Sequence, residues 1–194
     1  MKVVILDYGA GNVKSVAFAL NRLGVEGVLS HDIAEIQQAD RVIFPGQGEA
    51  SMAMKKLAQS GLDVLLPKLK QPVLGICLGM QLLFETTDEG PTMGLGILTG
   101  SVKRFQTGKI PQMGWNTIHS LKGPLFKGIE SDEFMYLVHS YYAPVVKETI
   151  AISNYGIDYS VAVQKDNFFG VQFHPEKSSA AGQQLLQNFI AITQ

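Results

Sequence analysis

Short apolar runs alternate with helical segments through the first half of the chain, and this alternation restricts the possible folds more than any other feature. Each run predicts a buried strand, and the intervening segments carry apolar residues at helical spacing. Strands are predicted at 3–6, 25–29, 41–44 and 73–76, and helices from 13, over 50–60 and 62–70, and from about 78. This order predicts an α/β fold with a mostly parallel central sheet and helices on both faces.

Local signals set several of these boundaries. Asn12 is a candidate N-cap for the first helix, and Gly24 is a candidate for the residue that closes it. The pair Pro45-Gly46 is predicted to end the third strand.

The second half is rich in Val, Ile, Tyr and Phe, which predicts additional antiparallel strands joined to the sheet. Lys165-Asp166-Asn167 indicates a hairpin turn, and Ser178 or Ser179 can cap a final helix. No linker, repeat or low-complexity stretch divides the sequence, so residues 1–194 are expected to form one domain.

The composition excludes several classes of function. Lys plus Arg number 16 and Asp plus Glu 17, which argues against a nucleic-acid partner. No apolar stretch has membrane-spanning length, and the N-terminal run is too short for a signal peptide. One cysteine permits no intramolecular disulfide, so a cytoplasmic location is expected. The four histidines lack metal-ligand spacing, and neither a metal nor a cofactor is expected.

The sharpest chemical signal is Gly75-Ile76-Cys77-Leu78-Gly79, at the junction of a predicted strand and helix. A nucleophile between two small residues at such a junction describes a nucleophile elbow. The helix start favours the reactive thiolate of Cys77, and the N–H of Leu78 can donate to an oxyanion. The plain alternative is a buried core cysteine, but the two glycines favour the nucleophile.

A second signal is Val171-Gln172-Phe173-His174-Pro175-Glu176. His174 and Glu176 are two residues apart, so in an extended chain they point the same way. The carboxylate can then hold one imidazole nitrogen and leave the other free as a base, as a Cys-His-acid triad requires. Taken alone, a strand end facing solvent is the slightly better interpretation; together with the elbow, the triad is clearly the better one.

A third signal is Pro45-Gly46-Gln47-Gly48, after the third predicted strand. Its glycines let the backbone approach a ligand, and its N–H groups can complete an oxyanion hole beside the elbow. An ordinary turn is the alternative. A phosphate-binding P-loop is disfavoured because the GxxxxGK[ST] pattern is absent.

These three segments occur in the same order in class I glutamine amidotransferases, and the chain resembles that family over essentially its whole length. The resemblance implies that Cys77 attacks the side-chain amide of L-glutamine. It also implies that His174 carries the proton to the leaving ammonia, that Glu176 orients His174, and that a glutamyl thioester is formed and hydrolysed.

Three further segments, DYGAGN at 7–12, MGWN at 113–116 and YLVHSYYAP at 136–144, resemble the glutaminase subunits of imidazole glycerol phosphate synthases. That resemblance implies a (β/α)₈-barrel cyclase partner in a heterodimer. The cyclase would receive ammonia through a tunnel and make imidazole glycerol phosphate and an aminoimidazole carboxamide ribotide (AICAR) in histidine biosynthesis.

The resemblance also assigns individual residues. The oxyanion and glutamine-binding residues it implies are Gly46, Gln47, Gly48, Leu78, Gln81, Glu89, Ser140 and Tyr141. The residues it places at the cyclase interface are Asn12, Trp115, Tyr136 and Lys177. Gln47 departs from the family, where a small apolar residue such as Val is expected.

Other interpretations of these positions stay open at this point. Gln81 lies one helical turn after Cys77 and can face the same pocket, whereas Trp115 alone would be core, Lys177 a surface lysine and His139 a core histidine. The rival functions are a free-standing cysteine hydrolase, an inactive binding module on the same fold, and a glutaminase that serves another synthase.

Overall fold

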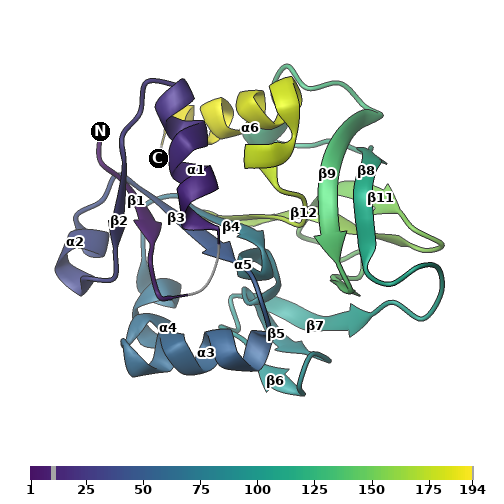
Figure 1. The fold of residues 1–194 in the computed structure, drawn as a ribbon, viewed down its shortest axis with the longest axis horizontal. Helices are drawn as coiled ribbons and strands as arrows, with labels where there is room; N and C mark the ends of the chain where they lie inside the picture. The colour runs from purple at the N-terminus through teal and green to yellow at the C-terminus, as the bar shows by residue number, and fades with distance from the viewer. Residues whose placement is uncertain (10–11, 194) are drawn as a thin grey trace.

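A computed structural model describes residues 1–9 and 12–193 of the chain. Its centre is a seven-stranded sheet in the order β11-β12-β13-β4-β3-β1-β2 (Figure 1). The neighbours from β13 to β2 are parallel, whereas β11 and β12 run antiparallel to their neighbours. The strand bounds are β1 Val3–Leu6, β2 Gly27–Ser30, β3 Arg41–Gly46, β4 Val73–Cys77, β11 Thr149–Asn154, β12 Asp158–Lys165 and β13 Phe168–Val171.

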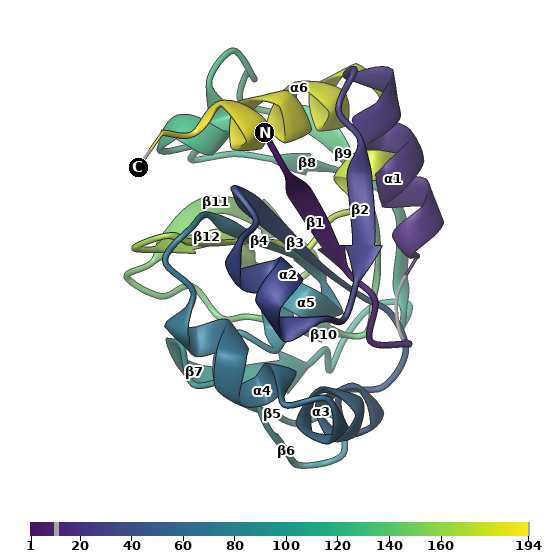
Figure 2. The same ribbon diagram turned by 90° about the vertical axis from the view of Figure 1, so that its left-hand side faces the viewer.

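Helices cover both faces of this sheet, as Figure 2 shows. The apolar run of β1 is continuous because both of its faces are buried: Val3 and Ile5 pack in one core, and Val4 and Leu6 in the other. The first core includes side chains of α1 (Val13–Arg22) and α6 (Ser179–Ala191). The second includes α2 (Ile33–Gln37), α3 (Ala50–Gln59), α4 (Leu62–Leu65) and α5 (Leu78–Gln81). The predicted α/β architecture is therefore confirmed.

Both predicted signals around the first helix are present. The side chain of Asn12 accepts a hydrogen bond from the Ser15 N–H at 3.4 Å, which satisfies one free donor of the first turn. Gly24 adopts a positive φ of 73° and donates its N–H to the Asn21 carbonyl, which closes the helix. The loop before Asn12 includes residues 10 and 11, which lie outside the described residues.

The extra strands do not all join the central sheet as the sequence predicts. Only β11, β12 and β13 lie in it, and β13 is parallel to β4 instead of antiparallel. β12 and β13 form the predicted hairpin, with Asp166 at a positive φ of 51°. The others form two small sheets, β10-β7-β5-β6 and β8-β9. Their bounds are β5 Phe84–Thr87, β6 Thr92–Met93, β7 Leu98–Arg104, β8 Gln112–Ile118, β9 Glu133–His139 and β10 Tyr141–Tyr142.

Two of the predicted boundaries are wrong for a local reason. β3 continues through Pro45 to Gly46, because the pairing of Gly46 with Cys77 on β4 tolerates one missing donor near the strand end. The predicted 62–70 helix is α4 followed by the 3₁₀ turn Leu66–Lys68, which contains Pro67. The helix predicted from about Leu78 begins there as α5, which is a single turn.

Two further 3₁₀ turns are formed by Pro124–Phe126 and Pro175–Lys177. Within residues 1–9 and 12–193, no helix is both long enough and apolar enough to cross a membrane.

Candidate active site

Cys77 lies at the last position of β4, in a backbone conformation that side chains rarely adopt, with φ 55° and ψ −112°. Gly79 is required beside it, because a Cβ there would overlap the Phe44 carbonyl oxygen. A Cβ on Gly75 would come within 2.8 Å of the Gly79 and Met80 backbone. The chain therefore turns sharply around the cysteine, which is the geometry expected of a nucleophile elbow.

The single turn of α5 supplies only a small helix dipole, so the expected contribution of a longer helix to thiolate formation is weaker than the sequence indicates. Two polar groups lie near the sulfur, one an acceptor and one a donor. Cys77 Sγ lies 3.8 Å from the Val138 carbonyl oxygen and 3.6 Å from Gln172 Nε2.

His174 and Glu176 are joined as the sequence predicts, by an Nδ1 to Oε1 distance of 2.9 Å. The reason differs from the expected one, because Pro175–Lys177 form a 3₁₀ turn and the chain is not extended there. The Glu176 side chain is 1% exposed and His174 is buried. Nδ1–H donates to the carboxylate, and among the described residues Nε2 has no hydrogen-bond partner, which leaves it free as a base.

The electrostatic surroundings favour a protonated His174. Burial alone would lower the pKa of this imidazole, but interactions with Cys77 and Glu176 outweigh burial and raise its pKa to about 10. The Cys77 sulfur and the Glu176 carboxylate therefore both act on the protonation of His174.

Ser178 fixes the backbone of His174. Its hydroxyl donates to the His174 carbonyl at 2.7 Å and accepts the Tyr136 N–H at 3.0 Å. The His174 N–H in turn donates to the Tyr136 carbonyl. The expected helix-capping bond from Ser178 is absent because its hydroxyl makes these contacts. Strand β9 and the His174 backbone are thus joined twice, once through the Ser178 hydroxyl and once by a direct backbone hydrogen bond.

The segment Pro45–Gly48 lies beside the elbow, because β3 and β4 are parallel neighbours. Its first half is packed: Pro45 and Gly46 are buried, and a Cβ on Gly46 would meet the Gly79 N atom. The Tyr8 hydroxyl donates to the Pro45 carbonyl at 3.0 Å. Its second half is open, since Gln47 and Gly48 are exposed and Gly48 has a φ of 100°.

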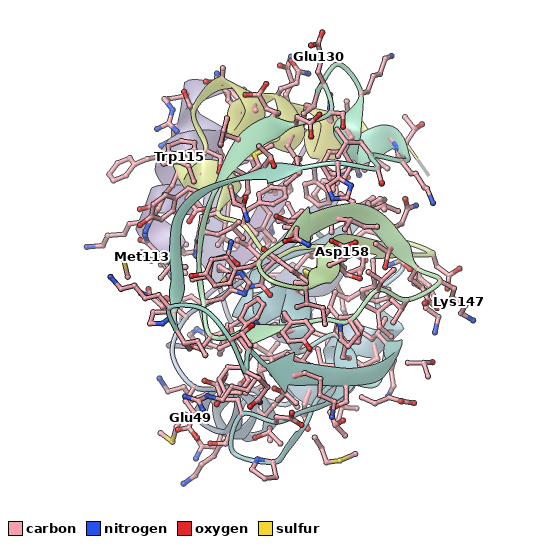
Figure 3. All side chains as sticks on the ribbon, turned by 90° about the vertical axis from the view of Figure 1, so that its right-hand side faces the viewer. Glu49, Met113, Trp115, Glu130, Lys147 and Asp158 are labelled. Atoms are coloured by element: carbon pink, nitrogen blue, oxygen red, sulfur yellow. The ribbon has the colours of Figure 1, made fainter. Side chains whose placement is uncertain are left out.

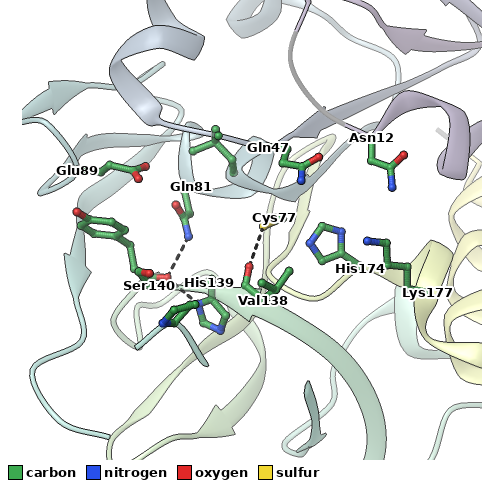
Figure 4. A pocket seen from close by; sticks show the side chains of 14 residues that line it. Asn12, Gln47, Cys77, Gln81, Glu89, Val138, His139, Ser140, His174 and Lys177 are labelled. Carbon is green, nitrogen blue, oxygen red and sulfur yellow. Dashed lines mark hydrogen bonds between the residues drawn. The ribbon is translucent and has the colours of Figure 1, made fainter. Parts of the chain in front are cut away.

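A pocket of about 230 Å³ opens above Cys77 and brings most of the predicted residues together (Figure 4). Its lining includes Asn12, Gln47, Gly48, Cys77, Leu78, Gln81, Glu89, Ser140, Tyr141, His174 and Lys177. Gly46, Glu176, Trp115 and Tyr136 are not part of this lining. Among the described residues, no group of three or more His, Cys, Asp or Glu side chains is arranged to hold a metal ion.

The wall opposite His174 is polar. Gln81 Nε2 donates to the Tyr141 carbonyl at 3.0 Å, and Glu89 Oε2 accepts the Ala50 N–H. Partial burial raises the pKa of Glu89. His139 is a buried histidine with a partner, as predicted: its Nδ1–H donates to the Tyr141 carbonyl, and burial lowers its pKa to about 4.

Three residues with direct contacts to this site were not singled out for it from the sequence: Tyr8, Gln172 and Ser178. Gln172 is fully buried and contacts both Cys77 and Gln81. Its signal was a polar residue in an otherwise apolar run, two positions before His174. Tyr8 and Ser178 carry no such signal, because Tyr8 bonds to Pro45 and Ser178 to Tyr136, backbone groups that are distant in sequence.

Beside the pocket, the β8–β9 ribbon presents the residues predicted to face a partner. Trp115 is 52% exposed and projects from the surface near Met113 (Figure 3). Its ring contacts Tyr136 edge to face, with ring centroids 5.9 Å apart. Lys177 Nζ lies 5.9 Å from the centre of the Tyr136 ring and also lines the pocket. An exposed surface therefore runs from Trp115 to the pocket mouth.

The sequence matches the family described as glutamine amidotransferase class-I over residues 4–192. The chain belongs to the class I glutamine amidotransferase family. It is 51% identical to imidazole glycerol phosphate synthase subunit HisH of Bacteroides fragilis (strain YCH46), over 99% of this chain and 100% of that protein. It is 48% identical to the protein of the same name from Yersinia pseudotuberculosis serotype I, with the same coverage of both chains. The predicted resemblance and enzyme class are thus confirmed.

Solved structures share the fold of this amidotransferase at low sequence identity. The crystal structure of a glutamine amidotransferase superposes with a TM-score of 0.77 at 20% identity, over 97% of each chain. PurLQS of Thermotoga maritima gives a TM-score of 0.74 at 18% identity, over 98% of this chain and 97% of the other. Both matches extend over nearly the whole chain, so the complete fold is shared.

Proposed function

We propose that this amidotransferase hydrolyses L-glutamine to glutamate and ammonia with Cys77, His174 and Glu176 as its catalytic residues. The observation that carries the proposal is that Cys77 and His174 line one pocket while Glu176 holds His174. Cys77 lies on a strained elbow, and Nδ1 of His174 is bonded to Glu176, so Nε2 is the ring nitrogen left for proton transfer.

The reaction follows from these positions. His174 Nε2 takes the thiol proton, and the Cys77 sulfur attacks the carboxamide carbon of glutamine. The imidazolium then donates that proton to the leaving nitrogen, which departs as ammonia and leaves a glutamyl thioester on Cys77. His174 next takes a proton from water, whose oxygen attacks the thioester and releases glutamate and the thiol.

The pocket residues have distinct roles in this proposal. The N–H of Leu78 and the backbone of Gly46, Gln47 and Gly48 stabilise the oxyanion. The glutamine is held by Gln81, Glu89, Ser140 and Tyr141, which line the pocket wall away from His174. A carboxylate such as Glu89 suits the substrate's α-ammonium group.

We infer that the partner is a (β/α)₈-barrel cyclase, because relatives at about half identity are named as subunits of imidazole glycerol phosphate synthase. The cyclase would dock on Trp115, Tyr136, Lys177 and Asn12 and would receive the ammonia. It would use that ammonia to make imidazole glycerol phosphate and AICAR in histidine biosynthesis. In this proposal residues 1–194 act as one domain in the cytoplasm.

The test separates glutamine use from ammonia use. Cys77→Ala mixed with the cyclase and its nucleotide substrate should lose at least about a thousandfold of glutamine-dependent product formation. Ammonium salts should restore product formation to the wild-type level, because the cyclase chemistry is untouched. Loss of both activities would assign Cys77 a structural role. Glutaminase activity with no effect on the cyclase would support another synthase partner or a free-standing hydrolase.

A further inference from the structure

Gln172 lies directly after β13, between the sulfur of Cys77 and the side chain of Gln81. It is fully buried, and its backbone N–H donates to the Val161 carbonyl. The side-chain amide spans the gap: Nε2 lies 3.6 Å from Cys77 Sγ, and Oε1 lies 2.8 Å from Gln81 Nε2.

The orientation of this amide follows from a backbone group. The Tyr141 carbonyl can only accept, so the side chain of Gln81 must present its NH₂ group there, at 3.0 Å. That NH₂ group has a second proton, which Gln172 Oε1 accepts. With its oxygen occupied in this way, Gln172 must turn its own NH₂ group toward the sulfur.

The sulfur is therefore placed between an acceptor and a donor. A neutral thiol can direct its proton to the Val138 carbonyl, 3.8 Å away. After that proton has left, the carbonyl oxygen has no hydrogen bond to make with the sulfur, whereas the Gln172 N–H donates to the anion. Hydrogen bonds to charged groups are the stronger kind, and burial strengthens them further. The donor thus favours the thiolate over the thiol.

We propose that Gln172 is a positioning residue that stabilises the Cys77 thiolate and links it to the substrate-binding side chain of Gln81. The inference rests on the proposed glutaminase reaction for its catalytic meaning, but its contact with the sulfur can be tested without substrate. Because Gln81 and Cys77 share this one amide, glutamine seated against Gln81 also holds the donor against the sulfur.

The first test is the pH dependence of Cys77 alkylation by iodoacetamide in the full chain. Cys77 is the single cysteine of the sequence, so the rate reports one sulfur. Gln172→Met keeps the side-chain volume and removes both hydrogen bonds. The pH midpoint of alkylation should rise by about one unit, a tenfold smaller thiolate fraction below the midpoint.

Gln172→Glu separates the two contacts and is the second variant should the first fail to fold. Its carboxylate keeps an acceptor for Gln81 but places negative charge against the sulfur, so the midpoint should rise further. Gln71→Met is the matched control. The Gln71 amide donates to the Ile36 carbonyl, and Gln71 lies just before β4, at the end opposite Cys77. It should leave the alkylation midpoint unchanged.

Glutamate release with the cyclase then distinguishes kcat from KM. Gln172→Met should lower kcat at least about tenfold and raise KM, whereas Gln172→Glu should lower kcat more and change KM less. An unchanged alkylation midpoint in folded Gln172→Met and Gln172→Glu would overturn the inference, even if wild type is a glutaminase. A shifted midpoint in a wild type without glutaminase activity would reject the proposed function and retain the contact.

Discussion

The elbow at Cys77 and the loop at Gln47–Gly48 follow neighbouring parallel strands, yet they are built in opposite ways. The elbow is closely packed: glycines on both sides of Cys77 have no room for a Cβ, and the sulfur is surrounded by polar groups of Val138 and Gln172. The loop is exposed, and a Cβ on Gly48 would meet nothing within 4 Å. One half of the candidate site is fixed by packing and the other is not.

This difference teaches where control of the reaction can lie. Transition-state stabilisation needs oxyanion donors that are aligned before the charge develops. Packing fixes the nucleophile, the base and the Leu78 N–H, whereas Gln47 and Gly48 are exposed and a Cβ on Gly48 would meet no described atom within 4 Å. A partner that docks beside the pocket mouth can supply that order, which is a coupling between two sites.

The largest expected difference in unfolding free energy comes from adding one methyl group to a glycine of the elbow and one to a glycine of the loop. Gly79→Ala should lower the free energy of unfolding by about 3 kcal/mol or more, because its Cβ overlaps the backbone oxygen of Phe44. Gly48→Ala should cost about 1 kcal/mol, the strain of a positive φ in open space. Urea unfolding of both variants measures the difference. Equal costs would remove the distinction between a packed elbow and an open loop.

The buried His139 in the pocket wall should make the stability of the protein depend on pH. The folded pKa of His139 is lowered to about 4, so its contribution to stability is present above about pH 6.5 and is lost as the pH falls toward 4. Between pH 7.5 and 5.0 the loss should be about 2 kcal/mol. His174, whose folded pKa is raised to about 10, changes stability in the opposite direction over this range.

The variant His139→Gln isolates the first contribution from the second. Its stability relative to wild type should rise by about 2 kcal/mol from pH 7.5 to pH 5.0, measured by urea unfolding at both pH values. A wild-type-to-variant difference that is independent of pH would show that His139 titrates normally and that the wall is open to water.

The smallest effect is expected at the point where β3 meets the loop. Tyr8→Phe removes the hydrogen bond to the Pro45 carbonyl and should cost about 1 kcal/mol in unfolding free energy. Tyr155→Phe is the control, because its exposed hydroxyl donates to the Lys109 carbonyl and should cost less. If the two variants cost the same, the packed part of the strand ends before Pro45.

The sequence predicts the packed half of the site well, because its signals are local. Gly75, Cys77 and Gly79 lie within five residues, and an elbow needs those small residues at that spacing. The parallel strands are equally clear, since strands buried on both faces are continuous apolar runs such as Val3–Leu6.

The remainder depends on contacts between distant segments. Gln172 meets Gln81 across 91 positions, and Tyr8 meets Pro45 across 37, so no local pattern marks either pair. The small sheets were missed for the same reason: β8 and β9 have strand-like sequences, but which strands they pair with is decided by the tertiary fold. The His174–Glu176 contact was predicted, although a 3₁₀ turn produces it.

The central claim, that the nucleophile is fixed while the oxyanion loop is not, is tested most directly by glutamate release from glutamine. The rate should be measured for the chain alone, with the cyclase, and with the cyclase and its nucleotide ligand. We expect low activity alone and an increase of at least about a hundredfold in the full complex, the scale of one oxyanion donor. High activity of the chain alone, unchanged by the cyclase and nucleotide, would contradict the claim, because the loop would then need no partner to order it.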